Sequence, residues 1–210
     1  INAGPEITRA GAAPEVLELA ELLGIPFSQG YSVYGDVPFQ HPLFQGFAGM
    51  GFPRGVRRTD VYLNLGAMMP DEGLITQPIK DTTTLIDARV EYEKIGNRFR
   101  TDVVITAGMK ETTVALLDAV KSKATAAQLE ALRAPRMEKA MQDYEKNKAR
   151  DRKRAAADWN SSPISAERLC YEMDQLLDEN AIVVVETGGR DPQRWMDFSP
   201  RKKDIIGPTT

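Results

Sequence analysis

The clearest pattern of hydrophobic and polar positions lies between residues 163 and 189. Apolar side chains first recur there at the three- and four-residue spacing of one helix face, and Ser165 stands where an N-cap is expected. These apolar residues are Leu169, Met173, Leu176 and Leu177. Residues 181–185 then form a β-branched run without polar alternation, which is typical of a parallel strand covered on both faces. The pattern predicts a helix that leads into a buried strand.

The predicted strand runs into Thr187 and a pair of glycines, Gly188 and Gly189, which allow two interpretations. In open α/β sheets, ligands bind beyond the carboxyl ends of the strands, and glycines there let backbone amides approach a phosphate group. A glycine pair is also typical of a tight turn without a ligand. The spacing alone leaves both interpretations open.

Strand and helix patterns alternate through residues 1–122. Strands are predicted at residues 1–4, 25–27, 61–66, 84–87 and 101–106, and helices at residues 14–24 and 111–121. Such alternation is typical of a parallel sheet with crossover helices, so it predicts a doubly wound α/β domain. Residues 30–57 are rich in glycine, proline and aromatic side chains, and we expect either a packed connection or the wall of a ligand site.

Residues 123–162 are predicted to form a helical linker, because they are rich in Ala, Glu, Lys and Arg and carry no strand pattern. Its basic residues cluster at Lys148, Arg150, Arg152, Lys153 and Arg154. Nearby acidic residues offset this cluster, which favours a solvated helix over an arm that binds nucleic acid. The net charge of −3 likewise gives no electrostatic case for nucleic acid or an anionic membrane. Residues 163–210 are predicted to begin a second α/β domain.

Few residues qualify as candidates for chemistry. The one cysteine, Cys170, excludes an intramolecular disulfide and falls in a predicted helix, where we expect it to pack. The one histidine, His41, excludes a histidine cluster, and a structural hydrogen-bonding role is favoured over catalysis. Asp87 ends a predicted strand, where its carboxylate is suited either to accept from a ribose hydroxyl or to cap the next turn.

Location and completeness can also be predicted from the sequence. No apolar run approaches the roughly 18 residues of a membrane span, and no signal peptide opens the chain, so a cytoplasmic location is predicted. Residues 1–4 look like the tail of a strand, and residues 205–210 stop where an element should begin. We therefore expect a piece of a longer polypeptide.

Five segments, taken in order, carry a resemblance to a known family. They are residues 11–26, residues 41–50 (HPL-x-x-G-x-x-G-M in the family), residues 59–67 (A-D-x-x-x-x-x-G-A), residues 86–97 (I-D-x-D-x-x-E-I-G-K-N) and residues 163–188. In this order they resemble thiamine diphosphate-dependent enzymes of the acetolactate synthase and benzoylformate decarboxylase type. Nearly the whole chain is covered.

The resemblance implies an enzyme with a pyrimidine-binding, a central and a diphosphate-binding domain. This chain would hold the central domain with a truncated first strand (1–122), the linker (123–162) and the start of the diphosphate-binding domain (163–210). The family's catalytic glutamate and its G-D-G…N magnesium motif match nothing here, so no catalytic and no metal-binding residue is predicted. By resemblance, Thr187, Gly188, Gly189 and Arg190 contact the cofactor diphosphate.

The activity implied is that of a lyase, decarboxylase or carboligase, or a transferase of the acetolactate synthase kind. It would cleave or form a carbon–carbon bond next to a carbonyl group in a 2-oxo acid or 2-hydroxyacyl substrate such as an acyl-CoA. Thiamine diphosphate and Mg²⁺ are the implied cofactors, held mainly by parts outside this chain. Active sites of the family lie between subunits, so a homo-oligomer, dimer or tetramer, is expected.

The central domain of some members binds FAD, ADP or the adenylate of CoA. Here Met68, Met69 and Pro70 stand in the loop where the synthases have G-x-R-F-D-D, and Arg89 replaces the second acid of I-D-x-D. FAD and ADP are therefore not favoured, and an empty or structural central domain is expected. The alternative to an enzyme is a module that binds FAD, ADP or CoA, or a purely structural module.

Overall fold

The computed structural model describes residues 1–30, 37–47, 56–69, 79–97, 99–185, 195–196, 198 and 204–206. Within these residues a six-stranded sheet has the strand order β3-β2-β1-β4-β5-β6. Its strands are β1 (Asn2–Ala3), β2 (Phe27–Gln29), β3 (Phe44–Phe47), β4 (Val61–Leu65), β5 (Thr84–Ala88) and β6 (Val103–Ile105). All neighbouring strands pair in parallel, and the winding direction reverses between β1 and β4. The predicted α/β class is confirmed.

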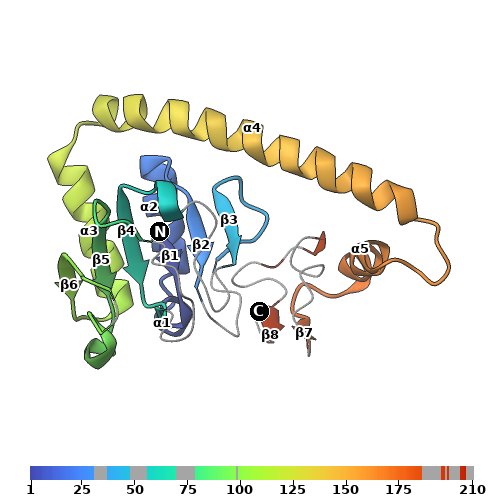
Figure 1. Ribbon diagram of the computed structural model, residues 1–210, viewed down its shortest axis with the longest axis horizontal. Helices are drawn as coiled ribbons and strands as arrows, with labels where there is room; N and C mark the ends of the chain where they lie inside the picture. The colour runs from blue at the N-terminus through green and yellow to red at the C-terminus, as the bar shows by residue number, and fades with distance from the viewer. Residues whose placement is uncertain are drawn as a thin grey trace.

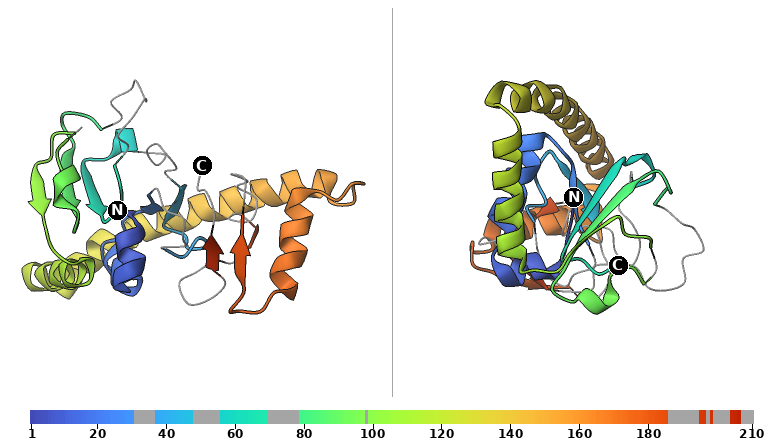
Figure 2. Two further views of the ribbon diagram at one scale, coloured as in Figure 1. Left: turned by 90° about the horizontal axis from the view of Figure 1, so that it is seen from below. Right: turned by 90° about the vertical axis from the view of Figure 1, so that its left-hand side faces the viewer.

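Three helices cover one face of this sheet: α1 (Pro5–Ala10), α2 (Ala13–Leu23) and α3 (Met109–Lys123) (Figure 2, right). Gly24 ends α2 in a left-handed conformation with φ 60°, which a glycine adopts without steric cost. Apolar residues of the helices and strands, among them Ile7, Val16 and Leu65, form the main buried cluster between the two layers. The opposite face carries a smaller cluster around Tyr62 and Leu85, together with the short 3₁₀ turn η1 (Val56–Arg58); a second turn, η2 (Tyr92–Lys94), follows β5.

The predicted linker contains one long helix, α4 (Ala126–Asp158), which runs from α3 past the sheet to α5 (Figure 1). Thr125 and Gln128 form a capping box at its start, and the helix continues through Pro135. Two arginines of α4 fix it to the end of α2: Arg133 Nε donates to the carbonyl of Glu21 at 3.0 Å, and Arg136 donates to that of Leu23 at 3.0 Å. The positive charges of these arginines also interact favourably with the negative, C-terminal end of the α2 dipole.

The last part contains α5 (Ala166–Leu176) and a two-stranded parallel sheet of β7 (Ile182–Val184) and β8 (Asp204–Ile206). Ser165 caps α5, as predicted, because its side chain accepts from the amide of Arg168 at 3.3 Å. The predicted apolar face of α5 is only partly right. Leu176 is 83% exposed and Leu169 is half-exposed, whereas the helix buries Cys170.

The prediction that residues 181–185 are covered on both faces is wrong within the described residues. Ile182 is 61% and Val184 74% exposed, while Val183 and Val185 pack against the main cluster. Alternate residues of a strand point to opposite faces, so one face of β7 is packed and the other is open. Among the described helices, none is both long and apolar enough to cross a bilayer.

Candidate functional site

A row of buried polar side chains crosses four neighbouring strands of the sheet. We call Ser28, Asn2, Asn64 and Asp87 the polar row. Backbone register sets Asn2 beside Ser28 and Asn64, and Asn64 beside Asp87. Because parallel strands in register bring side chains on one face together, the row follows from the register itself.

Hydrogen bonds run along the whole polar row. Ser28 Oγ donates to Asn2 Oδ1 at 3.3 Å, and Asn2 Nδ2 donates to Asn64 Oδ1 at 2.9 Å. Asn64 Nδ2 donates both to Asp87 Oδ1, at 2.7 Å, and to the carbonyl of Ala67, at 2.8 Å. All four side chains are buried, so each satisfied bond avoids the cost of a lone polar group in the core.

Alternation along β5 places the polar row on the face away from the three helices. Ala88 packs into the main cluster beneath the helices, whereas Leu85 packs with Tyr62 on the other face. Asp87 shares the face of Leu85. Burial raises the pKa of the Asp87 carboxyl, while the hydrogen bond from Asn64 and the charge of Arg89 act in the opposite direction.

Asp87 was predicted either to bind a ribose or to cap a turn, and its carboxylate instead ends the polar row. It also lines a cavity of about 10 Å³, enclosed by Met69, Leu85, Lys94, Gly96, Phe99 and Thr101. Such a volume corresponds to about one water molecule. It is too small for a ribose ring, so the described surroundings of Asp87 do not favour a nucleotide.

The crevice between β1 and β4, where the winding direction reverses, is filled by the chain itself. A Cβ added to Gly4 would lie 2.2 Å from Ala67 Cα, and one added to Gly66 would lie 2.5 Å from Glu6 Cβ. The amide of Gly4 donates to the carbonyl of Leu65 at 3.0 Å. In dinucleotide-binding domains a pyrophosphate occupies this crevice, so the packing argues against a dinucleotide there.

Two charged residues next to this crevice are also buried. Glu6 Oε2 accepts from the amide of Val90 at 2.8 Å. Arg89 is 3% exposed, and no acceptor among the described residues reaches its Nε atom. Arg89 stands where the I-D-x-D segment of the family has its second acidic residue, so this chain has a cation there whose charge acts on Asp87.

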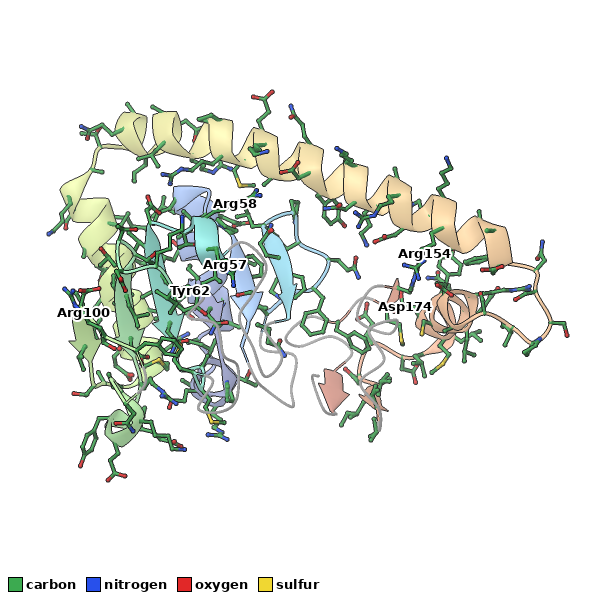
Figure 3. All side chains as sticks on the ribbon, in the orientation of Figure 1. Arg57, Arg58, Tyr62, Arg100, Arg154 and Asp174 are labelled. Carbon is green, nitrogen blue, oxygen red and sulfur yellow. The ribbon has the colours of Figure 1, made fainter. Side chains whose placement is uncertain are left out.

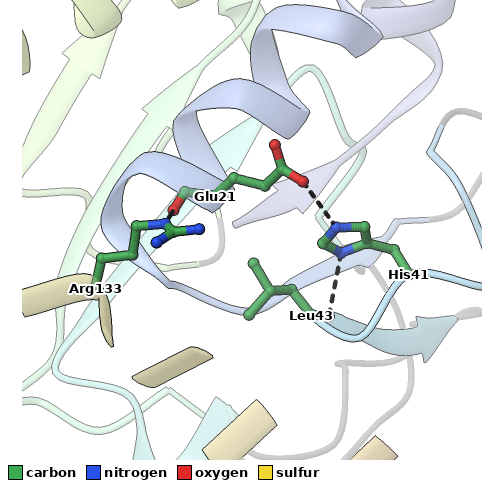
Figure 4. Close-up of polar contacts among 4 residues, drawn as sticks. All are labelled: Glu21, His41, Leu43 and Arg133. Carbon is green, nitrogen blue, oxygen red and sulfur yellow. Dashed lines mark hydrogen bonds and ion pairs between the residues drawn. The ribbon is translucent and has the colours of Figure 1, made fainter. Parts of the chain in front are cut away.

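His41 has the structural role favoured from the sequence. Its Nδ1 accepts from the amide of Leu43 at 3.2 Å, so Nε2 carries the proton of the neutral ring and faces Glu21 Oε1 at 3.1 Å (Figure 4). Arg133 of α4 donates to the backbone carbonyl of the same Glu21. Glu21 of α2 therefore contacts both His41, which precedes β3, and α4.

Two residues of the basic cluster of α4, Lys148 and Arg150, contact other residues of the chain. Lys148 donates to Gln40 and lies 5.5 Å from the centre of the Tyr144 ring, and Arg150 pairs with Asp151 at 3.5 Å. Arg154 projects from α4 on the side facing α5, where Asp174 lies (Figure 3).

The four predicted cofactor contacts, Thr187, Gly188, Gly189 and Arg190, lie outside the described residues and stay predictions. Cys170 is buried in α5, as expected for a packing residue. Within the part of the chain that the structure describes, no three His, Cys, Asp or Glu side chains gather as a metal site.

The strand order and the reversal between β1 and β4 define a doubly wound α/β domain of Rossmann type. The chain belongs to the thiamine pyrophosphate enzyme family, whose central-domain model matches residues 1–116.

Similar proteins agree with this family. The chain is 26% identical over 218 residues to a protein of Methanocaldococcus jannaschii described as a probable acetolactate synthase large subunit, covering 93% of this chain and 33% of that protein. Its fold is similar to benzoylformate decarboxylase from Polynucleobacter necessarius (TM-score 0.68, 15% identity, 98% of this chain and 36% of that one). It is also similar to a Rhodococcus jostii RHA1 thiamine diphosphate-dependent 4-hydroxybenzoylformate decarboxylase (TM-score 0.64, 14% identity, 99% and 37%). The chain thus spans about a third of the length of these relatives.

Proposed function

We propose that this chain is part of a thiamine diphosphate-dependent lyase or transferase that cleaves or forms a carbon–carbon bond next to a carbonyl group. The substrate class is a 2-oxo acid or a 2-hydroxyacyl compound. The family match over residues 1–116 carries the proposal, and the similarity along 93% of the chain to a protein described as a probable acetolactate synthase large subunit supports it.

The donor set at residues 187–190 fits the anionic end of the cofactor. Two glycine amides and an arginine guanidinium are suited to a diphosphate, and Mg²⁺ would neutralise the remaining charge. Bound thiamine diphosphate supplies the nucleophilic carbon and the electron sink of such reactions. Arg190 is proposed to bind and orient the diphosphate, while proton transfer and metal ligation are assigned to residues outside this chain.

The central domain is proposed to be structural. The filled crevice between Gly4 and Ala67 and the single-water cavity beside Asp87 support a sheet that packs and orients its neighbours without a nucleotide. We further propose a homo-oligomer, either a dimer or a tetramer, because the active sites expected of this family lie between subunits.

Calorimetry on the intact protein tests the function. We expect thiamine diphosphate with Mg²⁺ to bind, Arg190→Ala to weaken that binding, and FAD and ADP to give no heat. Assays with a panel of 2-oxo acids and 2-hydroxyacyl-CoA compounds should show bond cleavage only with the cofactor present. An intact protein that binds no thiamine diphosphate, or cleaves none of these substrates when loaded, would disprove the proposal.

A further inference from the structure

The main buried cluster extends from the central domain into the C-terminal part of the chain. The central domain consists of β1–β6 with α1–α3, and the C-terminal part of α5, β7 and β8 with residues 195–196 and 198. Met196 is 1% and Phe198 0% exposed, and both belong to the same cluster as Phe27 of β2. Cys170 of α5 lies in this cluster as well. The two parts therefore share one core.

A series of aromatic rings connects Phe198 with the sheet. The Phe198 ring meets the Phe39 ring edge to face, with 5.9 Å between the centroids. Phe39 stacks on Phe44 of β3 at 5.3 Å, and Phe44 lies 5.8 Å from Phe27 of β2. The amide of Phe39 also donates to the carbonyl of Phe198 at 3.2 Å. Phe198 is thus linked to β3 and β2 through packed rings and a backbone hydrogen bond.

Strand β3 stands at one edge of the six-stranded sheet, on the side where the C-terminal part lies (Figure 1). Gln40, shortly before β3, donates from Nε2 to the backbone carbonyl of Met196 at 3.0 Å. A segment that packs beside an edge strand protects it, because an exposed edge is open to other pairings. Met196 and Phe198 therefore support the edge of the central sheet.

The C-terminal part in turn depends on the central domain for its packing. Within the described residues α5 buries one side chain, Cys170, and a sheet of two strands such as β7 and β8 is only marginally stable alone. The side chains of Val183 and Val185 pack against the main cluster, whereas Ile182 and Val184 are exposed. The packed face of β7 is thus the face that meets the shared core.

We infer that Phe198 locks β2, β3 and the C-terminal part into one cooperative unit, which opens and closes as a whole. Two parts joined only by α4 would open independently. Here the opening of either part exposes Phe198 and the rings around it, so the free energies of opening are coupled. The inference holds with or without thiamine diphosphate, and its failure would leave the proposed function intact.

Amide hydrogen exchange of the intact wild-type protein, followed by mass spectrometry at increasing urea concentrations, tests the coupling. Peptides that cover α5 and β7 should show the same free energy of opening as peptides that cover β2 and β3, with the same dependence on urea. Different opening free energies in the two regions, in either direction, would overturn the inference.

Phe198→Ala tests the residue itself. Loss of a buried phenylalanine ring should accelerate exchange on the order of a hundredfold or more, by the same factor in both regions. Phe198→Leu should accelerate both about tenfold, and it replaces Phe198→Ala if that variant does not fold. Leu176→Ala is the control, because Leu176 of α5 is 83% exposed, and it should change exchange less than about twofold. Faster exchange confined to the C-terminal part, or equal effects of Phe198→Ala and Leu176→Ala, would refute the lock.

Discussion

Replacing Asn64 by alanine tests whether the polar row stabilises the sheet. The Asn64 side chain makes three buried hydrogen bonds, with Asn2, with Asp87 and with the carbonyl of Ala67. The substitution leaves an amide donor, a carboxylate oxygen and a carbonyl oxygen in the core without that partner.

The expected loss follows from the number of orphaned groups. A buried polar group without a partner costs about 1–3 kcal/mol, and more when it is charged. The carbonyl retains a second lone pair and water can enter part of the gap, so we expect a total of about 3–6 kcal/mol. That is a large share of the 5–15 kcal/mol that stabilises a typical domain.

Urea unfolding measures the loss, and Asn97→Ala is the matched control. Asn97 makes one exposed hydrogen bond, from Nδ2 to the carbonyl of Glu93 at 3.0 Å, so the same substitution should cost less than about 0.5 kcal/mol. The midpoint for Asn64→Ala should fall with the denaturant slope unchanged. A loss for Asn64→Ala below about 1 kcal/mol, or equal to that of Asn97→Ala, would refute the reasoning.

Three further substitutions test other parts of the site. Gly4→Ala places a Cβ within 2.2 Å of Ala67 Cα, so it should lower the free energy of unfolding, measured in urea, by more than about 3 kcal/mol. The control Gly11→Ala, at φ 61° with open space around it, should lower it by about 1 kcal/mol, and equal losses would contradict the filled crevice. Asp87→Asn removes a carboxyl group whose pKa burial raises above 3.8 in the folded protein. The stability that the bound proton contributes is present below pH 3.8 and is lost as the pH rises through the folded pKa, so the wild type should lose stability relative to the variant over that range. Parallel pH profiles of unfolding for the two proteins would disprove this. His41→Ala should lower the melting temperature by a few degrees without changing cofactor affinity, as expected for one or two partly exposed hydrogen bonds, and an altered Kd for thiamine diphosphate would contradict its structural role.

Much of the fold could be predicted because local patterns determine it. The helix over residues 14–24 was recognisable from its apolar spacing and Gly24, and the structure has α2 at Ala13–Leu23. The strands β4 and β5 were predicted as short strands at residues 61–66, which end in a glycine, and 84–87, which end in an acidic residue. Such elements depend on periodicity and capping, which the sequence shows directly.

The elements β3 and α1 were missed because their signals are weak or contradictory. The strand β3 contains Gly46 at φ 97°, a conformation that interrupts the expected strand pattern. The helix α1 has only six residues and starts with Pro5, so it is too short to show an apolar period. Each of them depends on tertiary packing.

The polar row could not be predicted, because it exists only through strand register. Asn2, Ser28 and Asn64 look like isolated polar positions in apolar segments, and only the pairing of β2, β1, β4 and β5 brings them together. The exposure of one face of β7 could not be predicted either, because an unbroken apolar run does not show which of its faces is covered. The candidate cofactor contacts came from family resemblance, and the two interpretations of the glycine pair stay open on spacing alone.

The long helix α4 fixes both the distance and the rotation about its axis between two anchoring residues. It is held near its start by Arg136, which donates to the carbonyl of Leu23, and farther along by Lys148, which donates to Gln40. Adding one residue between these two points would turn everything after it by about 100° about the helix axis and shift it by about 1.5 Å. Lys148 would then point away from Gln40 although every residue of both anchors was retained. Homologous helices of this kind should therefore vary in sequence between the anchors far more readily than in length.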